Sequence, residues 1–323
     1  MRTAADGRTV GLSESRAFTE PALWTLVGNT PLLPVRLSDG PTVRLKCEWF
    51  NPGGSVKDRA ALFILRDGIA RGELPGKRLL DASSGNTAIA YAVLGAAAGI
   101  GVTVCVPANA SVERKALLES YGAEVRFTDP LDGSDGAIRA ARKLAAGRPD
   151  EYWYADQYNH PANAQAHYLT TAEEIWWQSA GRITHLVAGL GTTGTMMGTG
   201  RRLKELNPAI GLVAVQPDGP FHGLEGLKHL ATAIVPGIYD PALPDRTEFV
   251  ATEAADEVVR RLARDAGLLV GWSTGAALVA AERVLSHSPA VPRGDAVVVV
   301  VAPDSGVRYL SEARRLSGEG GAL

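Results

Sequence analysis

A lysine that follows a Gly-Gly-Ser turn is the residue of this chain best suited to covalent chemistry. The turn and lysine lie in Asn51-Pro-Gly-Gly-Ser-Val-Lys57-Asp-Arg59, and apolar residues at helical spacing predict a helix over 55–71. The positive end of the helix dipole disfavours an ammonium at Lys57. A neutral amine can form a Schiff base or accept a proton. In isolation the same position also suits a solvated lysine, so its role depends on the motifs downstream.

Two loops rich in glycine and hydroxyl groups follow, each between a predicted strand and a predicted helix. The first separates a strand over 78–81 from a helix over 87–98 and consists of Ser83, Ser84, Gly85, Asn86 and Thr87. The second separates a strand over 185–188 from a helix over 193–206 and includes Gly191, Thr192, Thr193, Gly194 and Thr195. Amides at a helix N-terminus, supplemented by hydroxyls, bind anions. We expect the first loop to bind a carboxylate, with an ordinary helix cap as the alternative. We expect the second loop to bind an anion.

The second loop also satisfies the Gly-x-Gly-x-x-Gly pattern of dinucleotide-binding proteins, through Gly189, Gly191 and Gly194. That pattern requires an acidic residue at the end of the next strand to bind the ribose. Here the strand predicted over 212–216 ends in Gln216. A nicotinamide-dependent dehydrogenase is therefore an alternative supported by only part of its fingerprint.

The ordered set of motifs resembles the cysteine synthase family, whose members use pyridoxal phosphate for β-replacement on activated serines. The likeness is greatest to the branch with cysteine synthase B and the O-phosphoserine sulfhydrylases. Besides the lysine segment and the two loops, it rests on Gly28-Asn-Thr-Pro-Leu32, Gln157-Tyr158, Pro161-Ala-Asn163, Gly271-Trp-Ser-Thr-Gly275, Pro303-Asp-Ser-Gly306 and Arg308-Tyr-Leu-Ser311. The family's threonine and glycine in the first loop are Ser83 and Ala88 here, and His160 replaces an asparagine.

The resemblance implies a role for each of these residues. Lys57 would hold the cofactor as a Schiff base and remove the substrate α-proton. Gly191–Thr195 would bind the cofactor phosphate, Asn86 the ring oxygen and Ser273 the pyridine nitrogen. The residues implied for the substrate carboxylate are Ser83, Ser84, Gly85, Thr87 and Gln157. A neutral hydroxyl at the ring nitrogen makes the cofactor a weaker electron sink, which favours expulsion of a β-leaving group over transamination.

The implied reaction converts O-acetylserine or O-phosphoserine to cysteine, or to a related β-substituted alanine, through an aminoacrylate intermediate. The sulfur donor would be sulfide or a thiocarboxylated sulfur-carrier protein. Lys228 and His229 lie where O-acetylserine enzymes are Gly-rich, and no arginine occurs between Pro217 and Asp245. We therefore expect Lys228 or His229 to contact an anionic leaving group and to make O-phosphoserine at least as good a substrate as O-acetylserine. A solvated loop is the alternative. A β-eliminating dehydratase and a non-catalytic paralogue are further alternatives.

Composition narrows the class of protein. Of the 323 residues, 46% are hydrophobic and 21% charged, and the net charge of −2 provides no basic footprint for nucleic acid or anionic membrane. No apolar run is long enough to span a bilayer, and the histidines show no metal-ligand spacing with the cysteines. Cys47 and Cys105 are expected to be buried free thiols. These features predict a cytoplasmic enzyme that acts on a small molecule.

Strands alternate with helices along nearly the whole chain, which predicts an α/β protein with parallel sheets flanked by helices. The resemblance implies the two-domain fold of the tryptophan-synthase-β-like (fold type II) pyridoxal-phosphate enzymes, assembled as a homodimer. A smaller domain of residues 43–154 would carry Lys57 and the first loop. A larger domain of residues 1–42 and 155–323 would carry the phosphate loop. The cofactor would then lie in the cleft between them.

Overall fold

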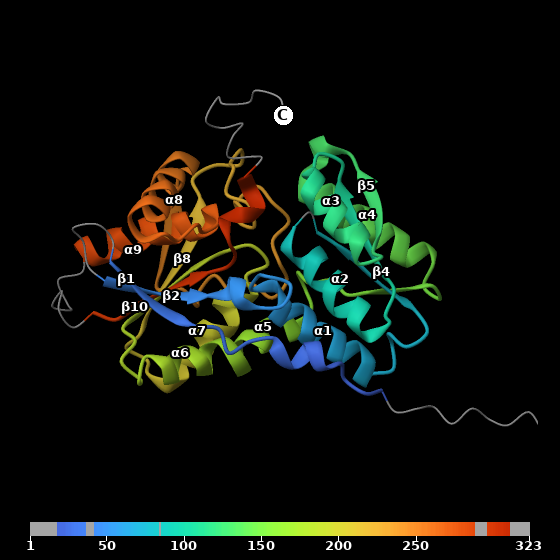
Figure 1. Cartoon of the computed structure of the whole chain (residues 1–323), viewed down its shortest axis with the longest axis horizontal. Coiled ribbons are helices and arrows are strands. Elements are labelled where there is room, and N and C mark those ends of the chain that lie inside the picture. Colours follow the sequence, from blue (N-terminus) through green and yellow to red (C-terminus); the bar gives the residue numbers. More distant parts are fainter. Residues whose placement is uncertain (1–17, 37–41, 84, 288–295, 311–323) are drawn as a thin grey trace, which may run out of the picture.

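Two sheets organise the molecule (Figure 1). The computed structural model describes residues 18–36, 42–83, 85–287 and 296–310. The larger sheet has the order β1-β2-β10-β7-β8-β9, and all its neighbouring pairs are parallel except β1 with β2. Its strands are β1 (Leu32–Arg36), β2 (Thr42–Cys47), β7 (His185–Gly189), β8 (Gly211–Pro217), β9 (Arg246–Val250) and β10 (Val298–Ala302).

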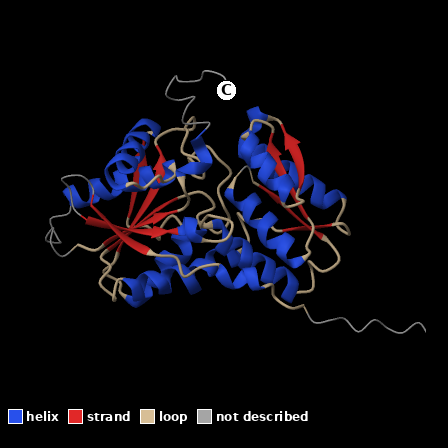
Figure 2. Cartoon of the chain, viewed as in Figure 1, coloured by secondary structure: helices blue, strands red, loops and turns tan. Residues whose placement is uncertain are grey.

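The smaller sheet is parallel throughout and has the order β5-β4-β3-β6. Its strands are β3 (Arg78–Ala82), β4 (Val102–Pro107), β5 (Glu124–Thr128) and β6 (Tyr152–Tyr154). These two parallel-rich sheets flanked by helices confirm the predicted fold class (Figure 2).

Helices cover both faces of each sheet, as crossover connections between parallel strands require. They are α1 (Lys57–Ala70), α2 (Asn86–Ala98), α3 (Val112–Ser120), α4 (Gly133–Gly147), α5 (Pro161–Ala166), α6 (Ala172–Gln178), α7 (Gly194–Leu206), α8 (Thr252–Ala266) and α9 (Trp272–His287). The single helix predicted over 162–178 is α5 and α6 joined by a π-helical turn, His167–Thr171. Short 3₁₀ turns are Ala22–Leu26, Glu48–Phe50, Pro130–Asp132 and Gly306–Tyr309.

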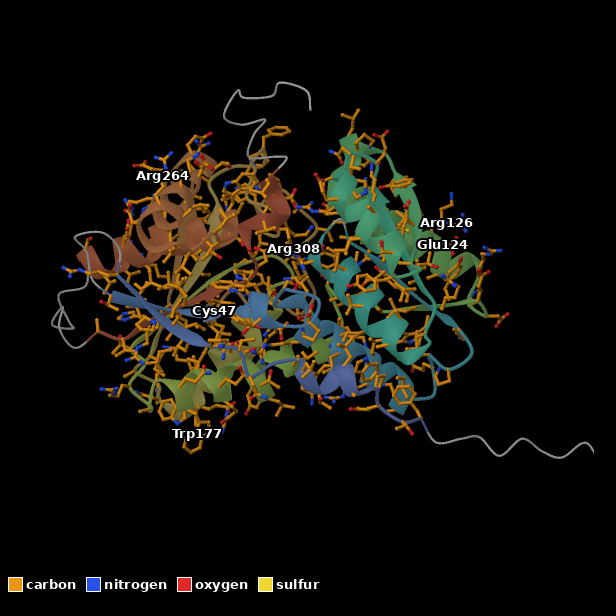
Figure 3. The ribbon with its side chains drawn as sticks, in the orientation of Figure 1. Cys47, Glu124, Arg126, Trp177, Arg264 and Arg308 are labelled. Carbon is orange, nitrogen blue, oxygen red and sulfur yellow. The ribbon has the colours of Figure 1, made fainter. Side chains whose placement is uncertain are left out.

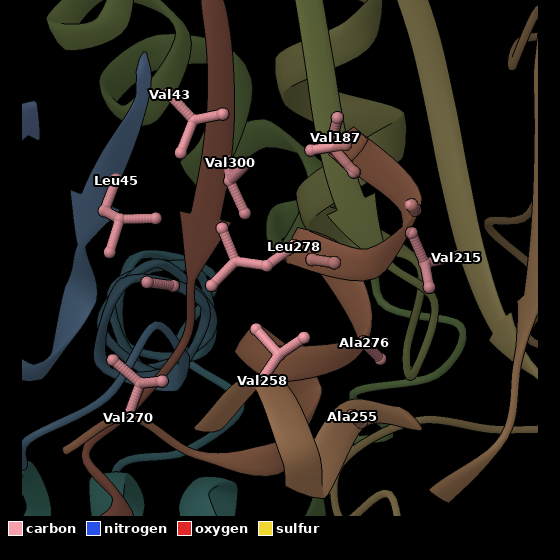
Figure 4. Close-up of a cluster of buried hydrophobic side chains, with 14 of the residues drawn as sticks. Val43, Leu45, Val187, Val215, Ala255, Val258, Val270, Ala276, Leu278 and Val300 are labelled. Carbon is pink, nitrogen blue, oxygen red and sulfur yellow. The ribbon is translucent and has the colours of Figure 1, made fainter. Parts of the chain in front are cut away.

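The hydrophobic core is divided by the sheets into separate layers. One face of the larger sheet packs on α8 and α9, where Val187, Val215 and Val300 meet Val258 and Leu278 (Figure 4). The other face packs on α6 and α7. In the smaller sheet one face packs on α1 and α2, and the other packs on α4. Since both faces of β10 are covered, its residues Val298–Ala302 are all buried and apolar.

The expected start of the smaller domain at residue 43 conflicts with the sheet topology. Strand β2 pairs with β1 and β10 in the larger sheet, with Leu45 opposite Val300. Helix α1 instead contributes Ala61, Ile64 and Leu65 to the core of the smaller sheet. We propose that the smaller domain begins after β2; its end near residue 154, where β6 closes the smaller sheet, stays a prediction.

Two further expectations concern single features of the chain. Cys47 and Cys105 are free and buried, as predicted, and burial raises the pKa of the Cys47 thiol to about 12 and that of Cys105 to about 11. Within the described residues, none of the helices combines the length and hydrophobicity needed to cross a bilayer.

Candidate active site

A pocket of about 630 Å³ lies between the two sheets and is lined from both sides. The smaller sheet's side contributes Lys57 and the loop after β3, and the larger sheet's side contributes the loop after β7 and Ser273 at the start of α9. Both loops follow the carboxyl ends of parallel strands, where α/β proteins commonly bind ligands. The tertiary structure therefore brings the predicted lysine and both predicted loops to one cavity.

Lys57 is the first residue of α1 and lines the pocket. Two contacts fix the backbone before it: the N–H of Val56 donates to the carbonyl of Pro303 at 2.9 Å, and Ser55 forms a β-bridge with Asp304. Burial lowers the pKa of the Lys57 amine, while the charge of Asp304 acts in the opposite direction. The net lowering favours the neutral amine that the sequence position suggested.

Arg59, on the helix that Lys57 begins, belongs to a set of charges that we call the floor network: Lys46, Glu48, Arg59 and Glu174. The Arg59 guanidinium donates to both oxygens of Glu48, at 2.7 and 2.9 Å, and to both oxygens of Glu174, at 2.6 and 2.8 Å. Lys46 Nζ donates to Glu174 at 2.6 Å. Glu174 also accepts the backbone N–H groups of Asn29 and Thr30. The opening motif around Asn29 thus completes the support for the start of α1.

The phosphate loop fits an anion without help from a cation. Thr193 has φ 68°, in the left-handed region, and α7 begins at the next residue, Gly194. A Cβ at Gly194 would lie 2.0 Å from Asn163 Oδ1, so the close approach requires glycine. Thr193 Oγ1 and Asn163 Oδ1 are buried without a hydrogen-bond partner among the described residues. The unpartnered hydroxyl and the helix N-terminus suit the phosphate of pyridoxal phosphate.

Neighbouring side chains hold this loop in place. Asn163 Nδ2 donates to Thr192 Oγ1 at 3.1 Å and to the carbonyl of Gln157 at 2.7 Å. Thr195 Oγ1 lies 3.3 Å from His167 Nε2, and burial lowers the pKa of His167 to about 3, which keeps the imidazole neutral. The sequence marks Asn163 only as part of a motif, because its contact with the phosphate loop, at Thr192, lies 29 residues away in the chain.

The predicted carboxylate-binding residues also come together. Thr87 Oγ1 donates to Gln157 Oε1 at 2.7 Å, and Gln157 Nε2 donates to the carbonyl of Ala82 at 2.8 Å. Ser83 Oγ accepts the N–H of Gly85 at 3.2 Å, so this hydroxyl helps to shape the turn. Ser84 lies outside the described residues. The N-terminus of α2 and Gln157 therefore share one wall of the pocket, although the sequence separates them by 70 residues.

Asn86 has partners that the sequence reasoning missed. Its Nδ2 donates to Asp304 Oδ2 at 2.6 Å, and its Oδ1 accepts a hydrogen bond from Arg308. Arg308 also donates to the carbonyl of Gly53, and Tyr309 donates to Asp304. Arg308 lies at the junction of the two halves of the molecule (Figure 3). Burial raises the pKa of Asp304, against the effect of these partners. The only sequence signal for these contacts was the Pro303–Ser311 motif, to which no role had been assigned.

Ser273 is the second residue of α9, is 4% exposed and lines the pocket. No hydrogen bond joins its hydroxyl to another described residue, so the group is available to a ligand. Its position on the wall opposite Lys57 is consistent with the role that the resemblance implied. That role stays a prediction.

Lys228 lines the pocket as expected, but its ammonium already has a partner. Lys228 Nζ lies 2.8 Å from Asp135 Oδ1 and 3.3 Å from Ser134 Oγ, at the start of α4. It also lies 5.0 Å from the centroid of the Tyr158 ring. The lysine is buried, and so it is not the solvated loop residue of the alternative interpretation. Its expected contact with a leaving group stays a prediction.

Other candidate residues have structural contacts. His160 caps α5 by accepting the N–H of Ala162 at 3.2 Å, and its Nε2 lies 3.4 Å from Asp67. The Gln216 side chain, which takes the place of the ribose-binding acid in a dehydrogenase, accepts the N–H of Leu230 at 3.0 Å. In the described part of the chain, no cluster of three His, Cys, Asp or Glu side chains could hold a metal ion.

Comparisons with known proteins agree with this site. A family model described as "Pyridoxal-phosphate dependent enzyme" matches residues 23–304. A cysteine synthase of Aquifex aeolicus is 50% identical over 295 residues, which cover 89% of this chain and 90% of the relative. Cysteine synthase B of Escherichia coli is 40% identical, covering 88% and 93%. The crystal structure of O-acetylserine sulfhydrylase isoform 3 from Entamoeba histolytica has a TM-score of 0.83 and 31% identity, covering 94% and 93%.

Proposed function

The chain belongs to the cysteine synthase family of pyridoxal-phosphate-dependent enzymes, and from this premise we propose that it forms L-cysteine from O-acetyl-L-serine and sulfide by β-replacement. The observation that carries the proposal is the position of Lys57. It begins α1 and lines the same pocket as the residues at the N-termini of α2 and α7. Family membership also overturns the dehydrogenase alternative, and the presence of Lys57 with both loops argues against a non-catalytic paralogue.

When bound, pyridoxal phosphate supplies the electron sink that makes the substrate α-proton acidic and the β-substituent able to leave. The amine of Lys57, with its lowered pKa, is suited to accept that proton. Since Ser273 offers a neutral hydroxyl rather than a carboxylate, it does not hold a proton on the ring nitrogen as a carboxylate would. This arrangement favours departure of a β-substituent.

Neutral donors bind both anionic groups in this proposal. Gly191–Thr195 hold the cofactor phosphate with backbone amides and hydroxyls at the start of α7. Ser83, Gly85 and Thr87, around the start of α2, hold the substrate carboxylate together with Gln157. We assign the same role to Ser84, which lies outside the described residues. We assign Asn86 to orienting the cofactor ring, held by Asp304 and Arg308. Binding on opposite walls places the substrate between the two sheets and next to Lys57.

Borohydride reduction of the holoenzyme, followed by peptide mapping, tests the role of Lys57. We expect the cofactor to become covalently fixed to Lys57 and to no other lysine. Purified enzyme with O-acetylserine and sulfide should release cysteine, and Lys57→Ala should lower turnover by orders of magnitude while still binding the cofactor weakly. A label on another lysine, or cysteine formation by Lys57→Ala at the parent rate, would refute the assignment.

A pair of glycine variants tests the phosphate loop. In Gly194→Ala the new Cβ would lie 2.0 Å from Asn163 Oδ1, so we expect cofactor occupancy of the purified protein to fall sharply. Gly147→Ala is the matched control, because a Cβ there meets nothing within 4 Å. Absorbance of the bound cofactor measures occupancy in both variants. Equal occupancy would mean that the loop does not hold the phosphate.

Other parts of the functional assignment stay predictions. The homodimer implied by the resemblance can be tested by sedimentation of the holoenzyme. The cytoplasmic location and the use of a thiocarboxylated carrier protein in place of free sulfide require separate tests. Supplying sulfide and a thiocarboxylated carrier in parallel reactions would distinguish the two sulfur donors.

A further inference from the structure

Two ion pairs connect the opposite walls of the pocket, and we call them the roof pairs. The first joins Lys228, in the segment between β8 and β9, to Asp135 on α4 at 2.8 Å. The second joins Glu225, in the same segment, to Arg114 on α3 at 3.3 Å. All four residues line the pocket. The segment that follows β8 of the larger sheet is thus attached, across the pocket, to helices of the smaller sheet.

Asp135 holds this segment by both carboxylate oxygens. Oδ1 accepts from Lys228 Nζ, and Oδ2 accepts the backbone N–H of Ile234 at 2.8 Å. The side chain of Lys228 is 7% exposed and that of Asp135 is 22% exposed, so water only partly solvates the pair. Burial by itself would raise the pKa of Asp135, but the hydrogen bonds from Lys228 and Ile234 outweigh it and leave the pKa below its usual value. Asp135 is therefore charged at neutral pH.

The charges that line the pocket are nearly balanced. Apart from Lys57, the lysine and arginine side chains of the described lining are Lys228 and Arg114, and each has a carboxylate partner. The remaining acid of the lining, Asp132, pairs with Arg139 at 3.1 Å on the outer side of α4. A second dianion beside the cofactor phosphate would find its nearest cations already neutralised.

We propose that Asp135, by holding the Lys228 ammonium, makes this site select an uncharged β-substituent such as an acetyl ester over a phosphate ester. This inference rests on the proposed β-replacement and names the substrate class of the same site. It reverses the expectation from sequence that Lys228 makes O-phosphoserine at least as good a substrate. Lys228 still governs the choice of leaving group, but its pairing with Asp135 determines which of the two esters is preferred.

The physical reason is competition for one cation. A phosphate that approached Lys228 Nζ would also meet the Asp135 carboxylate, whose nearest oxygen is 2.8 Å from that nitrogen. To capture the ammonium, the phosphate would have to displace a partly buried carboxylate and leave it with the N–H of Ile234 as its remaining partner. An acetyl ester is uncharged and requires no such exchange. Asp135 is thus a positioning residue that acts through Lys228.

The test is the variant Asp135→Asn, which keeps the shape and an acceptor for Ile234 but releases the charge on Lys228. We expect the ratio of kcat/KM for O-phosphoserine to kcat/KM for O-acetylserine to rise by about 10- to 100-fold, the range for a charge-assisted contact. The change should appear mainly in KM for O-phosphoserine, with kcat for O-acetylserine nearly unchanged. An unchanged ratio, or a parent enzyme that prefers O-phosphoserine, would overturn the proposal.

Two further variants separate this effect from a general loss of negative charge. Asp132→Asn removes one carboxylate from the same pocket lining and leaves Lys228 paired, so its ratio should match that of the parent. In Asp135→Asn/Lys228→Met the gain should disappear, because no free ammonium remains. A gain that appears with Asp132→Asn, or persists without Lys228, would show that the Lys228–Asp135 pair is not responsible.

A binding measurement keeps the inference testable if the proposed reaction itself is wrong. Added inorganic phosphate should raise the melting temperature of the Asp135→Asn holoenzyme more than that of the parent or of Asp132→Asn holoenzyme. If neither serine ester reacts with the parent, β-replacement fails while this comparison still tests the freed lysine. Equal phosphate effects in all three proteins would contradict the inference.

Discussion

The floor network and the roof pairs both contain two cations and two carboxylates, yet their surroundings differ. In the floor network Lys46 and Glu48 are 0% exposed, Arg59 is 1% exposed and Glu174 is 13% exposed. In the roof pairs Asp135 is 22% exposed and Glu225 is 39% exposed. Charges removed from water need several partners each, whereas partly exposed charges can be held by a single contact. Two cations and two carboxylates can therefore form either a rigid support or a contact that separates, depending on their surroundings.

The number of bonds follows this difference. Arg59 donates to two carboxylates and to the hydroxyls of Thr30 and Thr170. Lys228 has one carboxylate and one hydroxyl, and the Glu225 contact is 3.3 Å long. The floor network includes Arg59 of α1 and so anchors the helix that carries Lys57, which must stay in place. The roof pairs span the side of the pocket where the leaving group has to be recognised and released.

The largest expected effect is on stability, from breaking the floor network. Glu174→Gln leaves Arg59 and Lys46 short of a buried counter-charge, and we expect a loss of about 3–5 kcal/mol in the free energy of unfolding. Glu173→Gln is the matched control. Glu173 is the neighbour of Glu174 in the chain and pairs with Arg202 near the surface, so losing its charge should cost about 1 kcal/mol or less. Urea unfolding of both variants measures the difference. Equal losses would mean that the floor network contributes no special stability.

Acid should remove the stabilisation from the floor network between the ordinary pKa of Glu174 and its lower value in the folded protein. Burial raises the pKa of Glu174, but hydrogen bonds and charges from Arg59 and Lys46 outweigh this and bring it to about 2, below the ordinary value of 4.5. Because the folded-state pKa is depressed, the stabilisation is complete above about pH 4.5 and is lost as the pH falls towards 2.

The stability difference between the parent and Glu174→Gln should accordingly shrink as the pH is lowered from 5 to 3. Urea unfolding at each pH provides the measurement, and the Glu173→Gln difference serves as the reference. A difference that grows on acidification would contradict the assigned direction of the Glu174 pKa shift.

Breaking a roof pair should cost much less stability. In Asp135→Asn, Lys228 keeps an amide oxygen and the Ser134 hydroxyl nearby, so we expect a loss of about 1 kcal/mol in the free energy of unfolding. Urea unfolding measures this loss and allows it to be compared with the loss in Glu174→Gln. If the two variants lose similar amounts, the roof pair is as much a structural element as the floor network.

Salt should produce the smallest effect and act on the roof alone. Glu225 is the most exposed member of either set, so the stability cost of Glu225→Gln should shrink by a few tenths of a kcal/mol between low and about 0.5 M salt. The cost of Glu174→Gln should not change over the same range, because its partners are buried. If the cost of Glu174→Gln also fell with salt, water and ions would have to reach the charges of the floor network, against this prediction.

Secondary structure was largely predictable because periodic apolar residues and helix starts are local features. Strand β1 (Leu32–Arg36) was missed because Pro34 interrupts it, and a proline is tolerated there since β1 is an edge strand. The helix over 162–178 was expected to be continuous, but its π-helical turn leaves no signal in hydrophobic spacing. The sheet that receives β2 depends on its pairing with β10, more than 250 residues away in the chain.

The chemistry of the site was contained in short motifs. Lys57 at a helix start and the two hydroxyl-rich loops could be identified from spacing, because a strand, a loop and a helix N-terminus are encoded by consecutive residues. The partners of these groups could not. Asn86 meets Asp304 across 218 residues, and Lys228 meets Asp135 across 93. The sequence determined which groups can react, whereas the packing of the two sheets decided which charges are paired, since pairing depends on distances that only the folded chain sets.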